Sequence, residues 1–481
     1  MDKKLINEKF LSGSEIFSTI EDLCRYPHRR TGSKESAVAA EYIKERFKEA
    51  GLADVHFEET EAVNFDASDW FLKVNDKDID CFMINGTLHP EPFGCFETGE
   101  ECIGKELVYL GEGRAEDFEN ADIRGKIVLC DCPWFDSDEE VYATKWCREG
   151  SVTYDPDKSS RPVLRKTDSY SPNAWPYNYI TAQQKGAAGF IGVLNDYFDD
   201  GINWNEDYSE IALSCGCKAF EIPGLWIGTK AMKQVKSLLK ENKAKVSMGL
   251  KTRYRKGMAR NVVGVLEGMT DDTIIVHSHH DAVFTGAVQD ASGMAEVIAL
   301  AGYFGSIPKE QRKKTIVFAA LDGHYTDYAG HRDFVKKILD KGKNIVCDVV
   351  IGHIGKEVGL DKDNRPVVSD EPEIRLIYVT DIKDRVNTVT SLVKSEDIRR
   401  TVIMPVELKK HDEDTVYEFE QDEVISDAYY SSCAGIPVIS MLSPQMYLFH
   451  PMDTPEMVPQ KELKPVGVTF AQIIHYLMEE E

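Results

Sequence analysis

The sequence predicts an α/β fold, in which a mixed central sheet carries helices on both faces and a second, β-rich domain is inserted. Three observations lead to this prediction. Between residues 256 and 481, short apolar runs alternate with periodic apolar segments, which is typical of strands that alternate with helices. Two helical segments joined by a turn precede this region, at residues 14–50. From about residue 70 to residue 255, the pattern changes to short strands and turns.

The length of the chain also indicates two domains, because 481 residues exceed the size of one ordinary hydrophobic core. We assign residues 1–69 and 256–481 to a discontinuous α/β domain, and residues 70–255 to the inserted domain. Within the insertion, residues 132–178 are rich in aromatic residues, Asp, Ser and Pro and have little periodicity. This composition predicts a long loop, and long loops in compact domains are often functional.

Local patterns justify the individual elements. The second N-terminal helix ends at Gly51, as expected for a glycine that stops a helix. A terminal helix from about residue 464 to residue 479 is expected to cover the sheet. Apolar runs rich in β-branched residues predict strands at 52–60, 107–110, 126–130, 189–194, 260–268, 273–278, 315–321, 346–353, 373–379, 402–406 and 437–442.

Composition and charge exclude several kinds of partner. Hydrophobic residues make up 42% of the chain, which suits a globular protein, and the formal net charge is −25. This charge argues against nucleic acid or an anionic membrane surface as a partner. The N-terminus lacks an apolar run of signal-peptide length, and the eleven cysteines are an odd number for a disulfide framework. We therefore expect a cytoplasmic protein with reduced thiols.

The candidate site lies where two predicted strands end. The strand at 273–278 leads into His279, His280 and Asp281, and the strand at 315–321 leads into Asp322 and His324. Because side chains at the carboxyl ends of strands in an open α/β sheet face a common crevice, these groups are expected to lie close together. Six of the twelve histidines fall between His277 and His353. Imidazoles and carboxylates gathered in this way indicate a metal site.

Several of these residues have alternative interpretations. Asp281 lies two positions after His279, so its carboxylate can orient a ligating imidazole. Asp290 could bridge two ions, and His450 is a further candidate ligand. His353, at a strand end, could be a ligand or equally a core histidine with satisfied hydrogen bonds. The structural alternative is favoured for the remaining histidines of this region: His277 and His280 are expected to be packing residues, and His331 a surface or capping residue.

The ordered set of motifs resembles the co-catalytic zinc aminopeptidases, a group that includes aminopeptidase Y and the glutamate carboxypeptidase relatives. The resemblance rests on His279-x-Asp281, Asp290-Ala-Ser-Gly293, Gly435-Ile-Pro437, the late His450…Asp453-Thr454, and the opening Arg30-Thr-Gly-Ser33. Within the insertion, segments at 122–129, 185–189 and 222–224 resemble the protease-associated domain of these enzymes. The similarity extends over nearly the whole chain.

The resemblance implies that His279 and Asp290 are metal ligands, with Asp290 bridging two ions and Asp281 behind His279. It places His450 on the second ion. In these enzymes two adjacent glutamates follow the strand, one as general base and one as ligand, but the matching positions here are His324 and Tyr325. A histidine, His353, also lies at or beside the position of another acidic ligand.

We therefore predict a metal-dependent hydrolase that cleaves an amide-type bond in a peptide or small molecule. Metal-activated water would act in a histidine-rich variant of the aminopeptidase site. One or two divalent ions are expected, zinc first, with iron, nickel and manganese as alternatives. One ion would be held by His279, Asp290 and His353, and the other by Asp290, His324 and His450.

Asp322 and Glu357 are the candidate general bases, with Asp281 and His324 as further catalytic candidates. Two alternatives remain open: a true metalloaminopeptidase with a base supplied from elsewhere, and a non-catalytic relative that acts as a binding protein. A homo-oligomer is compatible with the sequence.

Overall fold

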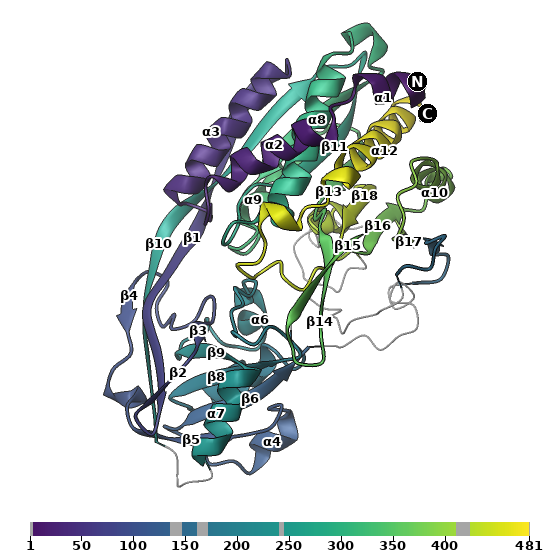
Figure 1. Ribbon diagram of the computed structural model, residues 1–481. Coiled ribbons are helices and arrows are strands. Elements are labelled where there is room, and N and C mark those ends of the chain that lie inside the picture. The colour runs from purple at the N-terminus through teal and green to yellow at the C-terminus, as the bar shows by residue number, and fades with distance from the viewer. Residues whose placement is uncertain (1–2, 135–146, 161–171, 240–244, 410–423, 481) are drawn as a thin grey trace.

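The chain folds around a mixed sheet with helices on both of its faces, as the sequence predicted (Figure 1). The computed structural model describes residues 3–134, 147–160, 172–239, 245–409 and 424–480. Four central strands run parallel to one another: β12 (Lys314–Leu321), β11 (Thr270–His279), β13 (Ile345–Ile351) and β18 (Val438–Leu442). Their carboxyl ends therefore share one edge of the sheet.

Further strands extend the sheet on both sides. The antiparallel strand β10 (Lys245–Leu266) pairs with β12. Beyond β18, β16 (Arg375–Thr380) is antiparallel to it and parallel to β17 (Thr401–Val406). The short strand β7 (Val152–Tyr154) pairs with β17 at this end of the sheet. A separate hairpin is formed by β14 (Lys356–Leu360) and β15 (Pro366–Pro372).

Alternation of side chains along β11 gives each face of the sheet its own helices. Ile274 and Val276 belong to the large core, which includes residues of α2 (Gly13–Cys24), α3 (Lys34–Glu49), α8 (Gly293–Gly305) and α12 (Gln460–Glu479). Ile275 points the other way and packs with Phe334 and Ile338 of α9 (Ala329–Asp340). Because residues two apart share a face, His277 and His279 follow Ile275 towards α9.

The remaining helices complete the two layers. On the side of α9 lies α11 (Tyr429–Cys433). Helix α1 (Lys3–Lys9) and helix α10 (Arg385–Ser395) both pack against α12. The 20-residue α12 covers the sheet, as predicted, and it begins four residues before the expected position.

A long antiparallel ribbon leads from this sheet to the segment between residues 74 and 245 (Figure 1). Its strands are β10 and β1 (Ala53–Val74), with β2 (Lys77–Ile79) and β4 (Gly94–Glu97) paired beside it. The expected domain boundaries at 69/70 and 255/256 both fall inside these strands. Leu72 and Met248 pair across the ribbon and pack in a second core with Ile127 and Leu225.

The segment beyond the ribbon has its own parallel strands. They are β5 (Lys105–Tyr109), β6 (Ile127–Pro133), β8 (Gly189–Asn195) and β9 (Gly224–Gly228), with the antiparallel β3 (Phe82–Met83) at the edge. The helices of this segment are α4 (Ala115–Glu119), α5 (Tyr177–Gln184), α6 (Ser209–Ser214) and α7 (Thr229–Leu239). The division into two domains and the protease-associated character of the insertion stay predictions. Much of the predicted loop at 132–178 lies outside the described residues.

Three further observations concern single residues and segments. The expectation that His331 lies at the surface or caps a helix was wrong, because its side chain is only 1% exposed in the first turn of α9. All eleven cysteines lie in described parts of the chain, and none of them forms a disulfide bond. Among the helices of the described residues, none combines the length and the apolar character needed to cross a membrane.

Candidate metal centre

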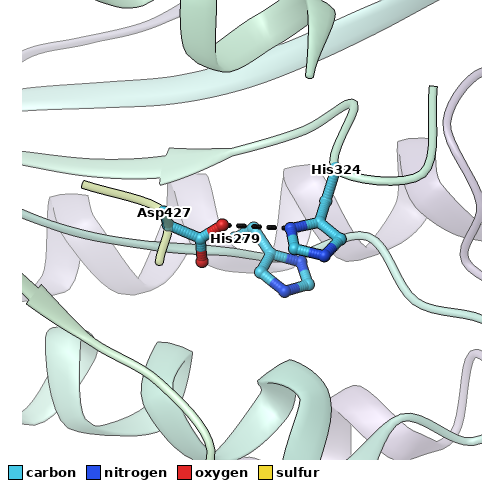
Figure 2. Close-up of side chains that lie close together, drawn as sticks. All are labelled: His279, His324 and Asp427. Carbon is cyan, nitrogen blue, oxygen red and sulfur yellow. Dashed lines mark hydrogen bonds and ion pairs between the residues drawn. The ribbon is translucent and has the colours of Figure 1, made fainter. Parts of the chain in front are cut away.

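Three side chains from separate parts of the chain meet at the carboxyl edge of the parallel strands (Figure 2). They are His279 at the end of β11, His324 in the turn after β12, and Asp427 just before α11. One ligand atom of each lies within 4.8 Å of the others. Because His279 pairs with Leu321 across the two parallel strands, the turn after Leu321 opens directly beside His279. We call these three residues the His-His-Asp cluster.

His279 is held in the orientation of a metal ligand. Its Nδ1 lies 3.0 Å from the Asp281 carbonyl oxygen and 3.2 Å from Asp281 Oδ1, so Nδ1 carries the proton and donates. Nε2 is fully buried and has no hydrogen-bond partner among the described residues. Burial, together with the neighbouring His324, lowers the pKa of His279. A neutral ring with a fixed tautomer leaves the Nε2 lone pair available for an ion.

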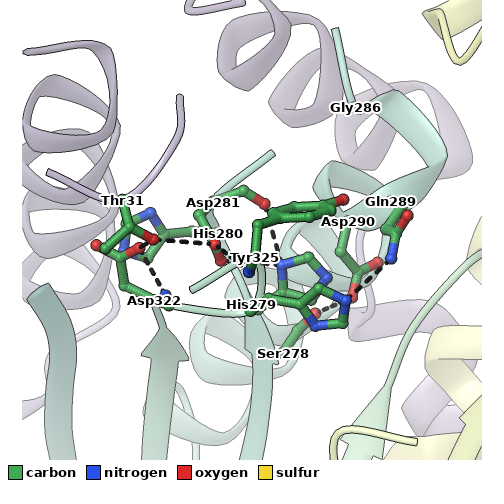
Figure 3. Close-up of polar contacts among 12 residues, drawn as sticks. Thr31, Ser278, His279, His280, Asp281, Gly286, Gln289, Asp290, Asp322 and Tyr325 are labelled. Atoms are coloured by element: carbon green, nitrogen blue, oxygen red, sulfur yellow. Dashed lines mark hydrogen bonds and ion pairs between the residues drawn. The ribbon is translucent and has the colours of Figure 1, made fainter. Parts of the chain in front are cut away.

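Asp281 is itself fixed on its other side. Its Oδ2 accepts hydrogen bonds from Thr31 Oγ1 at 3.2 Å and from the Tyr325 backbone N–H at 3.4 Å (Figure 3). Burial alone would raise the pKa of Asp281, but the hydrogen bond with His279 and the charge of His324 outweigh it and hold the pKa below its usual value. The ionised Asp281 therefore keeps the His279 ring in place.

His324 and Asp427 form the other half of the cluster. His324 Nδ1 donates to Asp427 Oδ1 over 3.0 Å, and the His324 ring stacks on His279 with centroids 4.1 Å apart and planes 12° from parallel. Burial lowers the pKa of His324, but the Asp427 carboxylate, with Glu206 and Asp281, outweighs that effect and raises the pKa to about 9. Asp427 is thus both the hydrogen-bond acceptor of His324 Nδ1 and its nearest carboxylate.

Two further polar side chains face the cluster. Gln289 Nε2 lies 3.2 Å from His324 Nε2, and the Gln289 backbone N–H donates to Asp453 Oδ2 at 3.0 Å. Glu206, from the loop between β8 and α6, places Oε1 3.9 Å from His324 Nε2. Burial raises the pKa of Glu206. Sequence reasoning missed Asp427, Gln289 and Glu206, because none of them belongs to a patterned motif.

Asp290, the expected bridging ligand, is hydrogen-bonded outside the cluster, and Figure 3 shows its carboxylate beside Ser278. Its Oδ2 accepts from the Ser278 hydroxyl at 2.5 Å, and its Oδ1 accepts from the backbone N–H groups of Gly293 and His353, both at 3.1 Å. Ser278 neighbours His279 on β11 and therefore points to the opposite face of the sheet. The carboxylate is occupied by donors of the α8 side, and the side chain of the preceding residue, Gln289, faces His324 instead.

The other expected ligands have different partners as well. His450 Nε2 lies 2.9 Å from Asp200 Oδ2, and His450 Nδ1 accepts from the Met452 backbone N–H at 3.1 Å. His353 Nδ1 lies 3.0 Å from the Ser443 carbonyl oxygen. Of the five predicted ligands, the structure thus brings His279 and His324 together, and it places Asp290, His353 and His450 outside the cluster.

The two expected general bases are also engaged elsewhere. Asp322 accepts from Thr31 Oγ1 at 2.7 Å, from the Arg260 backbone N–H at 2.9 Å and from Ser36 Oγ at 3.2 Å. Glu357 forms an ion pair with the buried Arg400 at 2.6 Å. Both carboxylates therefore tie structural elements together and do not face His324.

The cluster fits a divalent metal ion. Two imidazoles and a carboxylate converge, and the buried His279 Nε2 has no hydrogen-bond partner among the described residues. Nitrogen and carboxylate ligands of this kind suit zinc, and also iron or nickel. The surroundings carry further negative charge from Asp281 and Glu206, which favours a cation.

Comparison with solved structures identifies the fold of the chain. The chain resembles three solved structures: a Peptidase M28 precursor from Shewanella amazonensis (TM-score 0.70, 16% identity), a zinc aminopeptidase from Bacillus subtilis (0.62, 15%) and an aminopeptidase from an Aneurinibacillus species (0.61, 18%). The alignments cover 97–100% of this chain and 95–96% of each relative. The fold is therefore that of the zinc aminopeptidases, as the sequence predicted.

One stretch of the sequence also matches the model of a protein family. The family model of Peptidase family M28 matches residues 261–352, the stretch that carries β11, β12, His279 and His324. No curated protein matches the chain at a significant level. The family match and the buried cluster together support a metal-dependent hydrolase.

Proposed function

We propose that the protein is a metal-dependent hydrolase that cleaves an amide-type bond in a peptide or a small molecule. The observation that carries this proposal is the buried His-His-Asp cluster inside the segment that matches Peptidase family M28. The cluster lies at the carboxyl edge of the parallel strands, where catalytic groups of open α/β folds gather.

The ligand set of this proposal differs from the set expected from the sequence. His279 Nε2, His324 and Asp427 would hold one ion, probed most simply as zinc. When bound, the ion would supply Lewis acidity, which polarises a carbonyl group and lowers the pKa of water. Asp290 and His450 have other partners in the structure, Ser278 and Asp200. His353 lies outside the cluster, and its Nδ1 donates to the Ser443 carbonyl oxygen.

The remaining roles fall to the residues around the cluster. Asp281 keeps the proton on His279 Nδ1 and so keeps Nε2 free for the ion. Glu206 is the carboxylate that faces the cluster, and we assign it the role of accepting the proton of the attacking water at Oε1. The Gln289 amide would position a substrate group beside His324. The amide-type substrate, homo-oligomer formation and a cytoplasmic location stay predictions.

A non-catalytic binding function is the second candidate. One observation favours it: the turn after β12 carries His324 and the buried Tyr325 where the resembling enzymes carry two glutamates. A binding protein of this kind would still hold the ion but would cleave nothing. A true metalloaminopeptidase would require Glu206 to replace the missing base.

Metal analysis combined with a substrate screen tests the proposal. Purified protein is stripped with a chelator, reloaded with zinc, iron or nickel, and assayed on dipeptides, amino-acid anilides, N-acyl amino acids and small amides. We expect about one ion per chain and metal-dependent cleavage of at least one class. His279→Ala should abolish both, whereas His475→Ala, which alters a histidine on α12 far from the cluster, should change neither. Metal binding without cleavage would favour the binding function, and the absence of metal would contradict both.

A further inference from the structure

A third buried histidine lies beside the two histidines of the His-His-Asp cluster. His331, in the first turn of α9, is 1% exposed, and its Nδ1 lies 3.9 Å from Asp427 Oδ1. Its ring centroid lies 6.1 Å from that of His324 and 6.3 Å from that of His279. His331 therefore approaches the cluster from the α9 side, the side towards which β11 directs His279.

Neither ring nitrogen of His331 has a hydrogen-bond partner among the described residues. The 3.9 Å separation from Asp427 is too long for a hydrogen bond. A neutral imidazole has one donor and one acceptor, and burying both without partners costs free energy comparable to lost hydrogen bonds. An apolar side chain would fill the same place without this penalty, so the imidazole indicates a partner that the described residues do not supply.

We propose that His331 is a fourth protein ligand of the ion bound by His279, His324 and Asp427. This inference rests on the proposed function, because it requires an ion at the cluster. It accounts for a buried histidine beside Asp427 that has no hydrogen-bond partner among the described residues. It also gives the site three imidazoles and one carboxylate, a set that none of the sequence motifs indicated.

The ligand set has a consequence for metal selectivity. Imidazole suits zinc, copper, iron and nickel, whereas magnesium, calcium and manganese prefer oxygen ligands. A site with three imidazoles should therefore discriminate strongly against magnesium and calcium.

Copper bound to the wild-type protein counts the imidazoles directly, without any substitution. One equivalent of Cu²⁺ is added to the metal-free protein, and electron spin echo modulation from the remote ring nitrogens is recorded. Three coupled imidazoles are expected, and two would overturn the role of His331. Absence of copper binding at the cluster, judged by an unchanged result in His279→Ala, would overturn the proposed function together with this inference.

Zinc affinity of matched variants provides the second test. Competition with a chromophoric chelator should show binding weakened on the order of 10-fold or more in His331→Asn. His277→Asn is the matched control, because His277 is equally buried on β11 but its Nε2 pairs with Asp348 at 3.1 Å. Equal zinc affinity in the wild type and a folded His331→Asn would overturn the inference and leave the three-residue site standing.

Discussion

Asp427 Oδ1 lies 3.0 Å from His324 Nδ1, although the two residues are 103 positions apart in the chain. Asp427 precedes α11, and His324 follows β12, so the contact joins two separate segments at one edge of the sheet. Both side chains are buried, and the charge of His324 holds the pKa of Asp427 well below its usual range despite burial, which acts to raise it. The candidate site therefore includes a carboxylate, Asp427, that none of the sequence motifs predicted.

Replacement of Asp427 should weaken metal binding. We expect Asp427→Asn to lower zinc affinity roughly 10- to 100-fold, because a neutral amide replaces a charged ligand beside His324. Calorimetric titration of the metal-free protein measures the change. Asp381→Asn, at an exposed position, serves as the control. Unchanged affinity in a folded Asp427→Asn would remove Asp427 from the ligand set.

A carboxylate at position 289 should have the opposite effect. The Gln289 amide lies 3.2 Å from His324 Nε2, so Gln289→Glu adds a negative charge next to the bound cation. We expect tighter zinc binding than in the wild type, measured by chelator competition, whereas the exposed Gln234→Glu should leave affinity unchanged. Weaker binding in Gln289→Glu would show that the amide, as it stands, is required by the site.

Arg29 should be essential for stability near the site. The guanidinium is fully buried and donates to three backbone carbonyl oxygens, those of His280 (2.7 Å), Thr285 (2.7 Å) and Gly286 (2.6 Å). Arg29→Ala removes all three bonds and should lower the free energy of unfolding by about 3 kcal/mol or more. Urea denaturation measures it, with the exposed Arg25→Ala as the control. A loss below about 1 kcal/mol would contradict this structural role.

The buried Glu296 on α8 should make stability depend on pH. Neither carboxyl oxygen has a hydrogen-bond partner among the described residues, and burial raises the pKa of Glu296 well above its usual value. The folded state therefore keeps a proton that the unfolded state loses above pH 4.5. Stability contributed by this group falls as pH rises from 4.5, with a slope of at most about 1.4 kcal/mol per pH unit.

Glu296→Gln removes this ionisation, so the variant should be more stable than the wild type at pH 8, with a smaller difference at pH 5. Urea denaturation at both pH values measures the two free energies. The exposed Glu41→Gln should not change the pH dependence. Parallel stability profiles for wild type and Glu296→Gln would show that Glu296 is ionised in the folded protein.

Much of the fold could be predicted because the strands are short and apolar. The runs that end at His279 and before Asp322 are fully buried strands in the structure, as their composition indicated. The long ribbon was harder to predict, because exposed and buried residues are mixed along Ala53–Val74 and Lys245–Leu266. The sequence pattern changes within these strands, and for that reason the expected boundaries fall inside them.

The candidate site was predictable only in part. Parallel neighbours necessarily bring their ends together, so His279 and His324 could be paired from strand positions alone. The orientation of Gln289 and Asp290 depends on the path of the backbone at Ala287–Ser292, which no periodicity encodes. Asp427 follows residues without a regular pattern, and His331 was assigned to the surface because helix ends are usually exposed. Their burial beside the cluster follows from tertiary packing.

Crystals of the zinc-loaded protein test the central claim most directly. Anomalous diffraction recorded on both sides of the zinc absorption edge locates the ion without reference to any activity. The account predicts a peak at about 2.0–2.1 Å from His279 Nε2, with His324 and Asp427 among its ligands. A peak bound instead by Asp290 and His450, or zinc bound nowhere near His279, would contradict it.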